Sequence, residues 1–236
     1  MSQQHTVIMG GSSGIGLATA KLLLDRGHRV TIAGRSSDRL QKAADTLSGE
    51  MNTLIIDATR EQDLQQAFSR IESFDHLVVA LGSTKGAGAF ASVALSDVKA
   101  GVEEKFYAHF ACAQAALPYL RKDGSITFLS AVTAHAAMPG TAGIAAANAA
   151  VAALVPVLAS ELQPLRVNGV SPGVIDTPWW DFLSTEDKAA VFSDYAKSTP
   201  AGRVGNAEDI AQAVGFLIEN TYTSGQTIIC DGGLRL

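Results

Sequence analysis

Cysteine and charged side chains are scarce in this 236-residue sequence. Its two cysteines, Cys112 and Cys230, lie far apart, so we expect packing thiols rather than a disulfide or a metal site. Charged residues make up 17% of the chain, the net charge is −5, and no basic block is present. These properties argue against nucleic acid as the main partner.

Long hydrophobic runs are also missing. No apolar stretch approaches about 20 residues without interruption, and the first apolar run begins soon after Met1. We therefore expect no signal peptide, no membrane-spanning segment and a cytoplasmic protein. Hydrophobic residues make up 47% of the chain, which is enough for a sizeable core, and we predict a single α/β domain over residues 1–236.

What the sequence does contain, near its start, is a glycine-rich turn between a strand and a helix. The apolar run 6–9 precedes it and the helical pattern 17–24 follows it. Three glycines permit a tight turn, a close approach of a pyrophosphate to bare backbone, and close packing of helix against strand. The N–H groups that begin the helix add a partial positive charge. We predict that a nucleotide binds here, at Gly10, Ser12, Ser13, Gly14, Ile15 and Gly16.

Strand and helix patterns then alternate, which predicts a parallel sheet with helices on both faces. The expected strands are 6–9, 29–33, 54–56, 76–80, 125–129, 166–170 and 226–230, and the expected helices are 37–47, 61–71, 96–120 and 141–161. Pro118 and Pro156 fall inside the last two helices, where proline disturbs helical hydrogen bonding.

The end of the second strand indicates which nucleotide binds. An acidic residue there would bind a ribose 2′-hydroxyl, but the chain has Arg35 and Ser36, which suit a 2′-phosphate. We therefore expect NADP(H) rather than NAD(H), unless Arg35 is only a solvated surface residue. Asp57, beside Ala58 at the end of the third strand, is placed to accept a hydrogen bond from adenine, or else serves as a helix cap or loop carboxylate.

Several motifs together resemble the short-chain dehydrogenase/reductase family over nearly the whole chain. They are the glycine turn, Asp57-Ala58-Thr59, Ala115-Ala116-Leu117-Pro118, the run from Arg166 to Pro178, Gly202-Arg203-Val204-Gly205, Glu208-Asp209-Ile210-Ala211 and Asp231-Gly232-Gly233. The resemblance implies a Rossmann-type three-layer α/β/α sandwich with a doubly wound, mainly seven-stranded parallel sheet. It also implies a nicotinamide cofactor, a small-molecule substrate, no membrane partner, and a homodimer or homotetramer.

The resemblance assigns further cofactor contacts. Ala80, Leu81 and Gly82 replace most of the family's Asn-Asn-Ala-Gly motif after the fourth strand. The loop after the sixth strand would contribute Pro172, Gly173, Ile175 and Thr177, with the Ile175 backbone meeting the carboxamide and Thr177 near phosphate.

The family's catalytic set of Ser, Tyr and Lys is broken here. No tyrosine lies between Leu120 and Asp194, and no lysine lies between Asp123 and Asp187, so no register restores a Tyr-x3-Lys pair. Ungapped alignment places Ile144 at the tyrosine position, Asn148 at the lysine position and Ala131 at the serine position. Lys105 falls at the position of the family's helical asparagine.

Lysine and asparagine are thus exchanged across two helices, which places an ammonium near the nicotinamide ribose, paired with an amide rather than a phenol. Lys105 and Asn148 are therefore also expected cofactor contacts. A partly buried Lys105 can donate a proton or stabilise charge, although it is otherwise a solvated helix lysine. Ser130 can bind a carbonyl or merely cap its strand, and His135 can replace the missing acid or be solvated in its loop. We take Lys105, Asn148, Ser130 and His135 as the candidate catalytic residues.

Residues 178–200 resemble the family's substrate lid and contain both tryptophans of the chain, Trp179 and Trp180. An apolar lid would shape an apolar or aromatic pocket, unless this segment is buried against a partner subunit. Our first interpretation is an NADP(H)-dependent oxidoreductase acting on a carbonyl/alcohol pair. The alternatives are a non-catalytic NADP(H)-binding sensor and, on the same fold, a non-redox isomerase or lyase.

Overall fold

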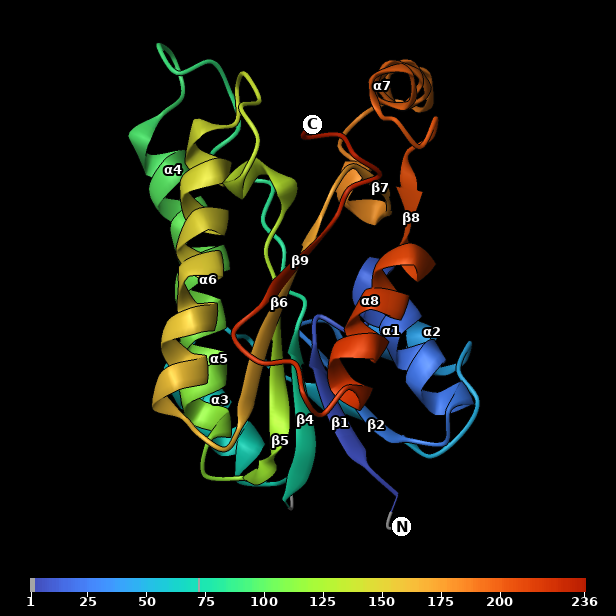
Figure 1. The fold of residues 1–236 in the computed structure, drawn as a ribbon, viewed down its shortest axis with the longest axis vertical. Helices are drawn as coiled ribbons and strands as arrows, with labels where there is room; N and C mark the ends of the chain where they lie inside the picture. The colour runs from blue at the N-terminus through green and yellow to red at the C-terminus, as the bar shows by residue number, and fades with distance from the viewer. Residues whose placement is uncertain (1–2, 72) are drawn as a thin grey trace.

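Seven parallel strands form a central sheet that runs through the middle of the molecule (Figure 1). The structure, a computed structural model, describes residues 3–71 and 73–236. The strand order is β3-β2-β1-β4-β5-β6-β9. The bounds are β1 His5–Met9, β2 Arg29–Gly34, β3 Met51–Ile55, β4 Phe74–Val79, β5 Leu120–Leu129, β6 Arg166–Pro172 and β9 Thr227–Cys230. Strand order reverses between β1 and β4, and open sheets of this kind bind ligands at that point.

Helices cover both faces of the sheet (Figure 1). One face carries α1 Gly14–Asp25, α2 Ser37–Ala44 and α8 Ala207–Glu219, and the other carries α3 Glu61–Phe68, α4 Leu95–Val102, α5 Ala108–Ala116 and α6 Ala142–Glu161. Each layer has its own apolar core, one around Leu23, Ile32 and Val214 and the other around Phe68, Phe74 and Phe128. The predicted Rossmann-type three-layer fold is confirmed.

The expected continuous helix 96–120 is wrong in two respects. A π-helical turn, Glu103–Tyr107, separates α4 from α5, and α5 ends at Ala116. Pro118 has no N–H with which to continue the helix, so the chain turns there and enters β5 at Leu120. Pro156 has less effect, because α6 continues through it to Glu161.

Elements that the sequence pattern did not predict lie after β6. They are the short parallel pair β7 Ile175–Asp176 and β8 Gly205–Asn206, and helix α8, whereas helix α7 Thr185–Ser198 lies within the expected lid. Helix α8 begins with a capping box, in which Asn206 and Asp209 each accept a hydrogen bond from the backbone N–H of the other. Arg203 also donates two hydrogen bonds to the Asp209 carboxylate, at 2.6 and 2.9 Å.

Helix α6 corrects one statement about apolar runs. It has 20 residues and a mean hydropathy of 2.0 over its most apolar window, so by length and composition alone it could cross a membrane. Between Ala142 and Ser160 the helix contains no charged residue, and Asn148, Pro156 and Ser160 divide its apolar positions into shorter runs. In the fold, α6 packs on the sheet, with Val151 and Val155 in the same core as Val167 of β6.

Candidate functional site

A cleft of about 860 Å³ lies at the carboxyl ends of the strands. It gathers almost all the residues that the sequence singled out, although they come from eight separate stretches of the chain. The lining includes Gly10, Ser12, Ser13, Gly14, Ile15, Gly16, Arg35, Ser36, Ala58, Ala80, Leu81, Gly82, Lys105, Ser130, Asn148, Pro172, Gly173, Ile175 and Thr177. Asp57 and His135 are not among the lining residues.

The glycine turn is shaped to receive an anion against bare backbone. Gly10 and Gly14 have φ angles of +82° and +51°, which favour glycine. A Cβ on Gly10 would lie 2.7 Å from the Ala80 carbonyl oxygen, and one on Gly16 would collide with the Gly10 carbonyl. Ser13, the N-cap of α1, makes no side-chain capping bond, so the first N–H groups of the helix are left for a ligand.

Two guanidinium groups line the end of the cleft beyond β2. Arg35 follows the strand, and Arg39 lies one helical turn further on, in α2. The Ser36 hydroxyl accepts a hydrogen bond from the Arg39 N–H at 3.3 Å and so caps α2. Sequence reasoning missed Arg39, because Arg35 precedes α2 and the two residues share no helical periodicity that would signal the pair.

Asp57 forms a hydrogen-bonded turn with Thr59. Its Oδ1 accepts hydrogen bonds from the Thr59 N–H at 3.0 Å and from the Thr59 hydroxyl at 2.7 Å. Partial burial raises the pKa of Asp57, but the Thr59 hydrogen bonds and the charge of Arg35 outweigh it, so the net pKa lies below its ordinary value. Asp57 is therefore held as an anion within its own turn, while Ala58 and Thr59 face the cleft.

Lys105 is the buried cation of the site. It is the middle residue of the π-helical turn, and its Nζ donates hydrogen bonds of 2.8 Å to the carbonyl oxygens of Leu81 and Leu129. Burial lowers the pKa of Lys105 from 10.5 to about 7. An ammonium has three N–H groups, so two are used by these carbonyls and one remains for the cleft that Lys105 lines.

Asn148 lies in the same cleft but does not pair with Lys105, contrary to the expected lysine–amide contact. Its Nδ2 donates to the Thr133 hydroxyl at 3.2 Å and to the Ile144 carbonyl at 3.1 Å. Its buried Oδ1 has no partner within residues 3–71 and 73–236. A buried acceptor of this kind is satisfied by a ligand hydroxyl or by water. Ile144 also lines the cleft, so an apolar wall stands where the resemblance places a tyrosine.

Ser130 and His135 occupy very different environments. Ser130 is buried at the end of β5, where its N–H and hydroxyl both lie within reach of the Val170 carbonyl, at 2.9 and 3.4 Å. The longer of these bonds is weak, which leaves the hydroxyl available to the cleft. His135 is an exposed loop residue away from the cleft lining, as in the solvated alternative, so its placement gives no support to the expected acid role.

An aromatic cluster in residues 178–200 closes one side of the cleft. Trp179 and Trp180 stack edge to face at 4.8 Å between ring centroids, and Phe182, Phe192 and Tyr195 pack around Trp180. Trp179, Trp180 and Tyr195 line the cleft. Tyr195 is a phenol that the fold brings into the cleft from a helix distant in sequence from α6.

A chain of hydrogen bonds ties this cluster to the helix of Lys105. Trp179 Nε1 donates to the Ser83 carbonyl at 2.9 Å, and the Ser83 hydroxyl donates to Glu104 Oε2 at 2.7 Å. Trp180 Nε1 donates to the Ile175 carbonyl at 3.0 Å. Sequence reasoning did not single out Ser83 or Glu104, because neither belongs to a motif that signals this contact.

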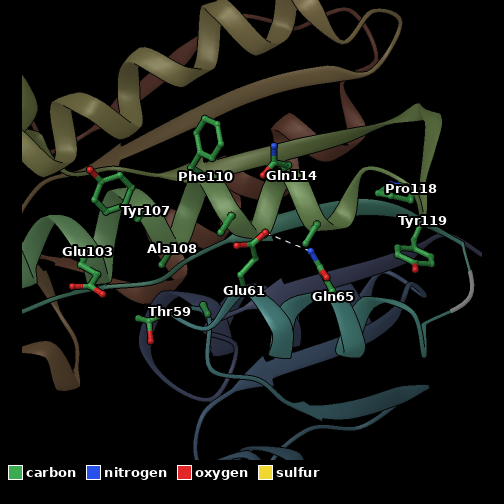
Figure 2. Close-up of a pocket in the computed structure, with 13 residues that line it drawn as sticks. Thr59, Glu61, Gln65, Glu103, Tyr107, Ala108, Phe110, Gln114, Pro118 and Tyr119 are labelled. Atoms are coloured by element: carbon green, nitrogen blue, oxygen red, sulfur yellow. Dashed lines mark hydrogen bonds between the residues drawn. The ribbon is translucent and has the colours of Figure 1, made fainter.

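A second groove, of about 920 Å³, lies between α3 and the π-turn with α5 (Figure 2), and it shares Ala58 and Thr59 with the cleft. Thr59, Glu61 and Gln65 form one wall, and Tyr107, Phe110 and Gln114 lie along the opposite helix. Within residues 3–71 and 73–236, no group of three or more His, Cys, Asp or Glu side chains is placed to hold a metal ion.

The chain is similar to known reductases along nearly its whole length. A family model described as enoyl-(acyl carrier protein) reductase matches residues 10–235. Carbonyl reductase family member 4 of Danio rerio is 32% identical over 237 residues, which cover 98% of this chain and 97% of the relative. The 3-oxoacyl-(acyl-carrier-protein) reductase FabG of Thermotoga maritima is 32% identical over 242 residues, with 97% and 96% covered.

Two solved structures are also similar to this chain over nearly its whole length. A small-chain dehydrogenase in complex with NADPH matches with a TM-score of 0.87 at 33% identity, and 99% of each chain is covered. The MalC reductase/Diels-Alderase of Malbranchea aurantiaca matches with a TM-score of 0.90 at 25% identity, covering 98% of this chain and 95% of that one.

Proposed function

The chain belongs to the short-chain dehydrogenase/reductase family, and from that premise we propose that it is an NADP(H)-dependent oxidoreductase acting on a small, apolar carbonyl/alcohol pair. The observation that carries the proposal is the buried Lys105 amine, which lines the same cleft as the glycine turn. When bound, the nicotinamide supplies or accepts the hydride, and the protein supplies position, polarity and the proton.

The cleft fits the cofactor at both of its ends. The glycine turn and the α1 N-terminus suit the pyrophosphate, while Arg35 and Arg39 suit a 2′-phosphate. Asn148 Oδ1, a buried acceptor without a partner within the described ranges, suits a hydroxyl of the nicotinamide ribose. The similar dehydrogenase that was solved with NADPH supports the same choice.

Replacement of Arg35 by alanine is expected to weaken NADPH binding roughly 10–100-fold, the equivalent of one charged hydrogen-bonding group. NADH binding should change little, because NADH has no 2′-phosphate. Titration of cofactor fluorescence measures both affinities. The matched control is Arg60→Ala, which removes an exposed arginine that does not line the cleft. Equal losses for both cofactors would contradict a role in 2′-phosphate recognition.

Lys105 is the group that we assign to proton transfer. For carbonyl reduction, its ammonium donates the free N–H to the substrate oxygen as the hydride arrives at carbon, and the neutral amine remains bound to the Leu81 and Leu129 carbonyls. A pKa of about 7 leaves both protonation states accessible near neutral pH. The Ser130 hydroxyl is close enough to the cleft to orient the same oxygen.

The substrate class follows from the rest of the wall. Ile144, Met138, Trp179 and Trp180 line the cleft and present apolar surface. We propose that residues 178–200 act as a lid that covers an aromatic or aliphatic substrate, within a single catalytic domain spanning residues 1–236. The carbonyl group of such a substrate would lie beside Lys105, and the apolar side chains of the cleft would exclude water from both groups.

The test is transfer of deuterium from NADPH labelled at the nicotinamide C4 to a panel of aryl and alkyl aldehydes and ketones. Deuterated alcohol, detected by mass spectrometry, would establish the activity. Tight NADPH binding without transfer to any member would instead favour the NADP(H)-binding sensor, which the missing tyrosine–lysine pair supports. No binding of either cofactor would remove both functions.

We also propose a homodimer or homotetramer formed through α5 and α6. Both helices cover the same face of the sheet (Figure 1), and they leave Phe110 and Val157 42% and 59% exposed. Exposed apolar patches of this kind mark interaction surfaces.

A charge placed on this surface should separate the subunits. Val157→Glu combined with Phe110→Glu is expected to yield monomer at concentrations where the unaltered chain is oligomeric, because two carboxylates would be buried without partners. Light scattering after size exclusion gives the mass directly. Leu95→Glu on α4, also exposed, is the control. A monomeric unaltered chain would rule out the assembly.

A further inference from the structure

The helix that carries Lys105 is irregular at that residue. Between α4 and α5, the turn Glu103–Tyr107 is π-helical, and the Ala108 N–H reaches back five residues to the Glu103 carbonyl. A π-turn holds one more residue than an α-turn, so relaxing it would rotate Lys105 relative to one flanking helix by about 100°. The direction of the Lys105 side chain therefore depends on the interactions that stabilise this π-helical turn.

One side chain bonds directly to the turn. His109 Nδ1 lies 2.7 Å from the Lys105 carbonyl oxygen, and a carbonyl can only accept, so Nδ1 carries the proton. The ring is fully buried, with its centroid 6.1 Å from that of Phe128 in β5. Burial, and then the charge of Lys105, hold the pKa of His109 well below its ordinary value. His109 is thus a fixed, neutral donor and not a proton carrier.

The other ring nitrogen argues against simple packing. His109 Nε2 is buried and makes no hydrogen bond of standard geometry within residues 3–71 and 73–236, although the Leu129 and Val79 carbonyls lie close enough to act on the pKa of the ring. Leaving a buried polar atom unpaired disfavours the folded state, and an aliphatic side chain would fill the space without that penalty. What histidine adds at this place is the bond from Nδ1 to Lys105.

We propose that His109 is a positioning residue, which fixes the π-turn through the Lys105 carbonyl and thereby holds the Lys105 amine against Leu81 and Leu129 in the cleft. The effect of His109 on catalysis rests on the proposed function, because it assumes that Lys105 transfers a proton. The structural part of the proposal is independent of turnover, because it concerns where one amine lies.

Two amide variants separate positioning from packing. In His109→Asn the amide nitrogen can reach the place of Nδ1, whereas in His109→Gln it reaches the place of Nε2, which leaves the Lys105 carbonyl with the Ala108 backbone N–H but without its side-chain donor. The first measurement is the rate at which Lys105 is acetylated by acetic anhydride between pH 6 and 10, followed by peptide mass spectrometry. Exposed Lys99, on the same helical run, serves as the internal reference.

Lys85 and Tyr195 line the same cleft from other elements, but burial alone accounts for the lowered pKa of Lys105. Two further titratable groups are on its own helix. They are His109, which stays neutral, and Glu104, which is bonded by Ser83. The neighbouring strand ends offer carbonyl groups, and α6 offers Asn148, which does not titrate. A change in the acetylation profile therefore reports movement of the amine and not titration of a neighbour.

In the unaltered chain and in His109→Asn, the profile should have its midpoint near the pKa of about 7. In His109→Gln and His109→Leu, the midpoint should move towards 10.5, the ordinary pKa of lysine, with NADPH affinity unchanged. Deuterium transfer should then fall at least tenfold in the Gln variant and be restored in the Asn variant.

The outcomes are distinguishable. A profile that shifts with His109→Gln, in a chain that transfers no deuterium, supports positioning while the proposed function fails. Indistinguishable profiles and kcat values for the Asn and Gln variants overturn the positioning role. If His109→Leu does not fold, the Asn and Gln pair still decides the result.

Discussion

Replacement of Lys105 by methionine is expected to lower the rate of hydride transfer by about 10²–10⁴-fold, the usual contribution of a general acid. Methionine keeps the length and the apolar stem of lysine but removes every N–H that the structure directs at Leu81, Leu129 and the cleft. Single-turnover transfer from NADPH labelled with deuterium isolates the chemical step from product release. NADPH affinity should change only a few-fold, because the phosphate contacts lie at the other end of the cleft.

The matched control is Lys99→Met, which removes an exposed lysine from the same helical run. It should leave both rate and affinity unchanged. Equal single-turnover rates for the unaltered chain and Lys105→Met would eliminate Lys105 as the proton donor. The next candidate would then be Tyr195, the phenol that α7 brings to the cleft.

The rate of carbonyl reduction is expected to be constant below pH 7 and to fall about tenfold for each pH unit above it. The sign follows from the group that must act: reduction needs the ammonium, and burial has lowered the pKa of Lys105 to about 7. Alcohol oxidation needs the neutral amine, so its rate should instead rise up to pH 7 and then level off. Single-turnover rates between pH 6 and 9 test both limbs.

Lys105→Arg provides the control for this profile, since a guanidinium does not titrate in that range. Any residual activity in that variant should lose the inflection near pH 7. A flat reduction profile from pH 6 to 9 in the unaltered chain is incompatible with a proton donor of this pKa. It would point instead to a donor that stays protonated throughout.

The architecture was largely predictable because it depends on local patterns. A buried parallel strand is a short apolar run, so strands such as β1 and β6 stand out in the sequence, and the glycine turn marks the first crossover. Boundaries were less accurate where a single backbone group decides them, as at Pro118. The pair β7 and β8 is too short for a periodic signal.

The site was predictable in its membership but not in its contacts. Counting along motifs placed Lys105 and Asn148 in one cleft, yet their hydrogen-bond partners depend on distances that no pattern encodes. The Lys105 amine bonds to Leu81 and Leu129, which reach it from two different strand ends. The place of Tyr195 in the cleft could not be predicted either, because it depends on how α7 packs against the rest of the fold and not on a local sequence pattern.

The placement of the two indoles has a practical consequence. Trp179 and Trp180 are the only tryptophans in the sequence, and both lie in the segment over the cleft. One is anchored to the Ser83 carbonyl and the other to the Ile175 carbonyl. Tryptophan fluorescence excited near 295 nm therefore originates wholly from this segment. Its emission maximum and anisotropy report movements of the segment in real time without an attached dye.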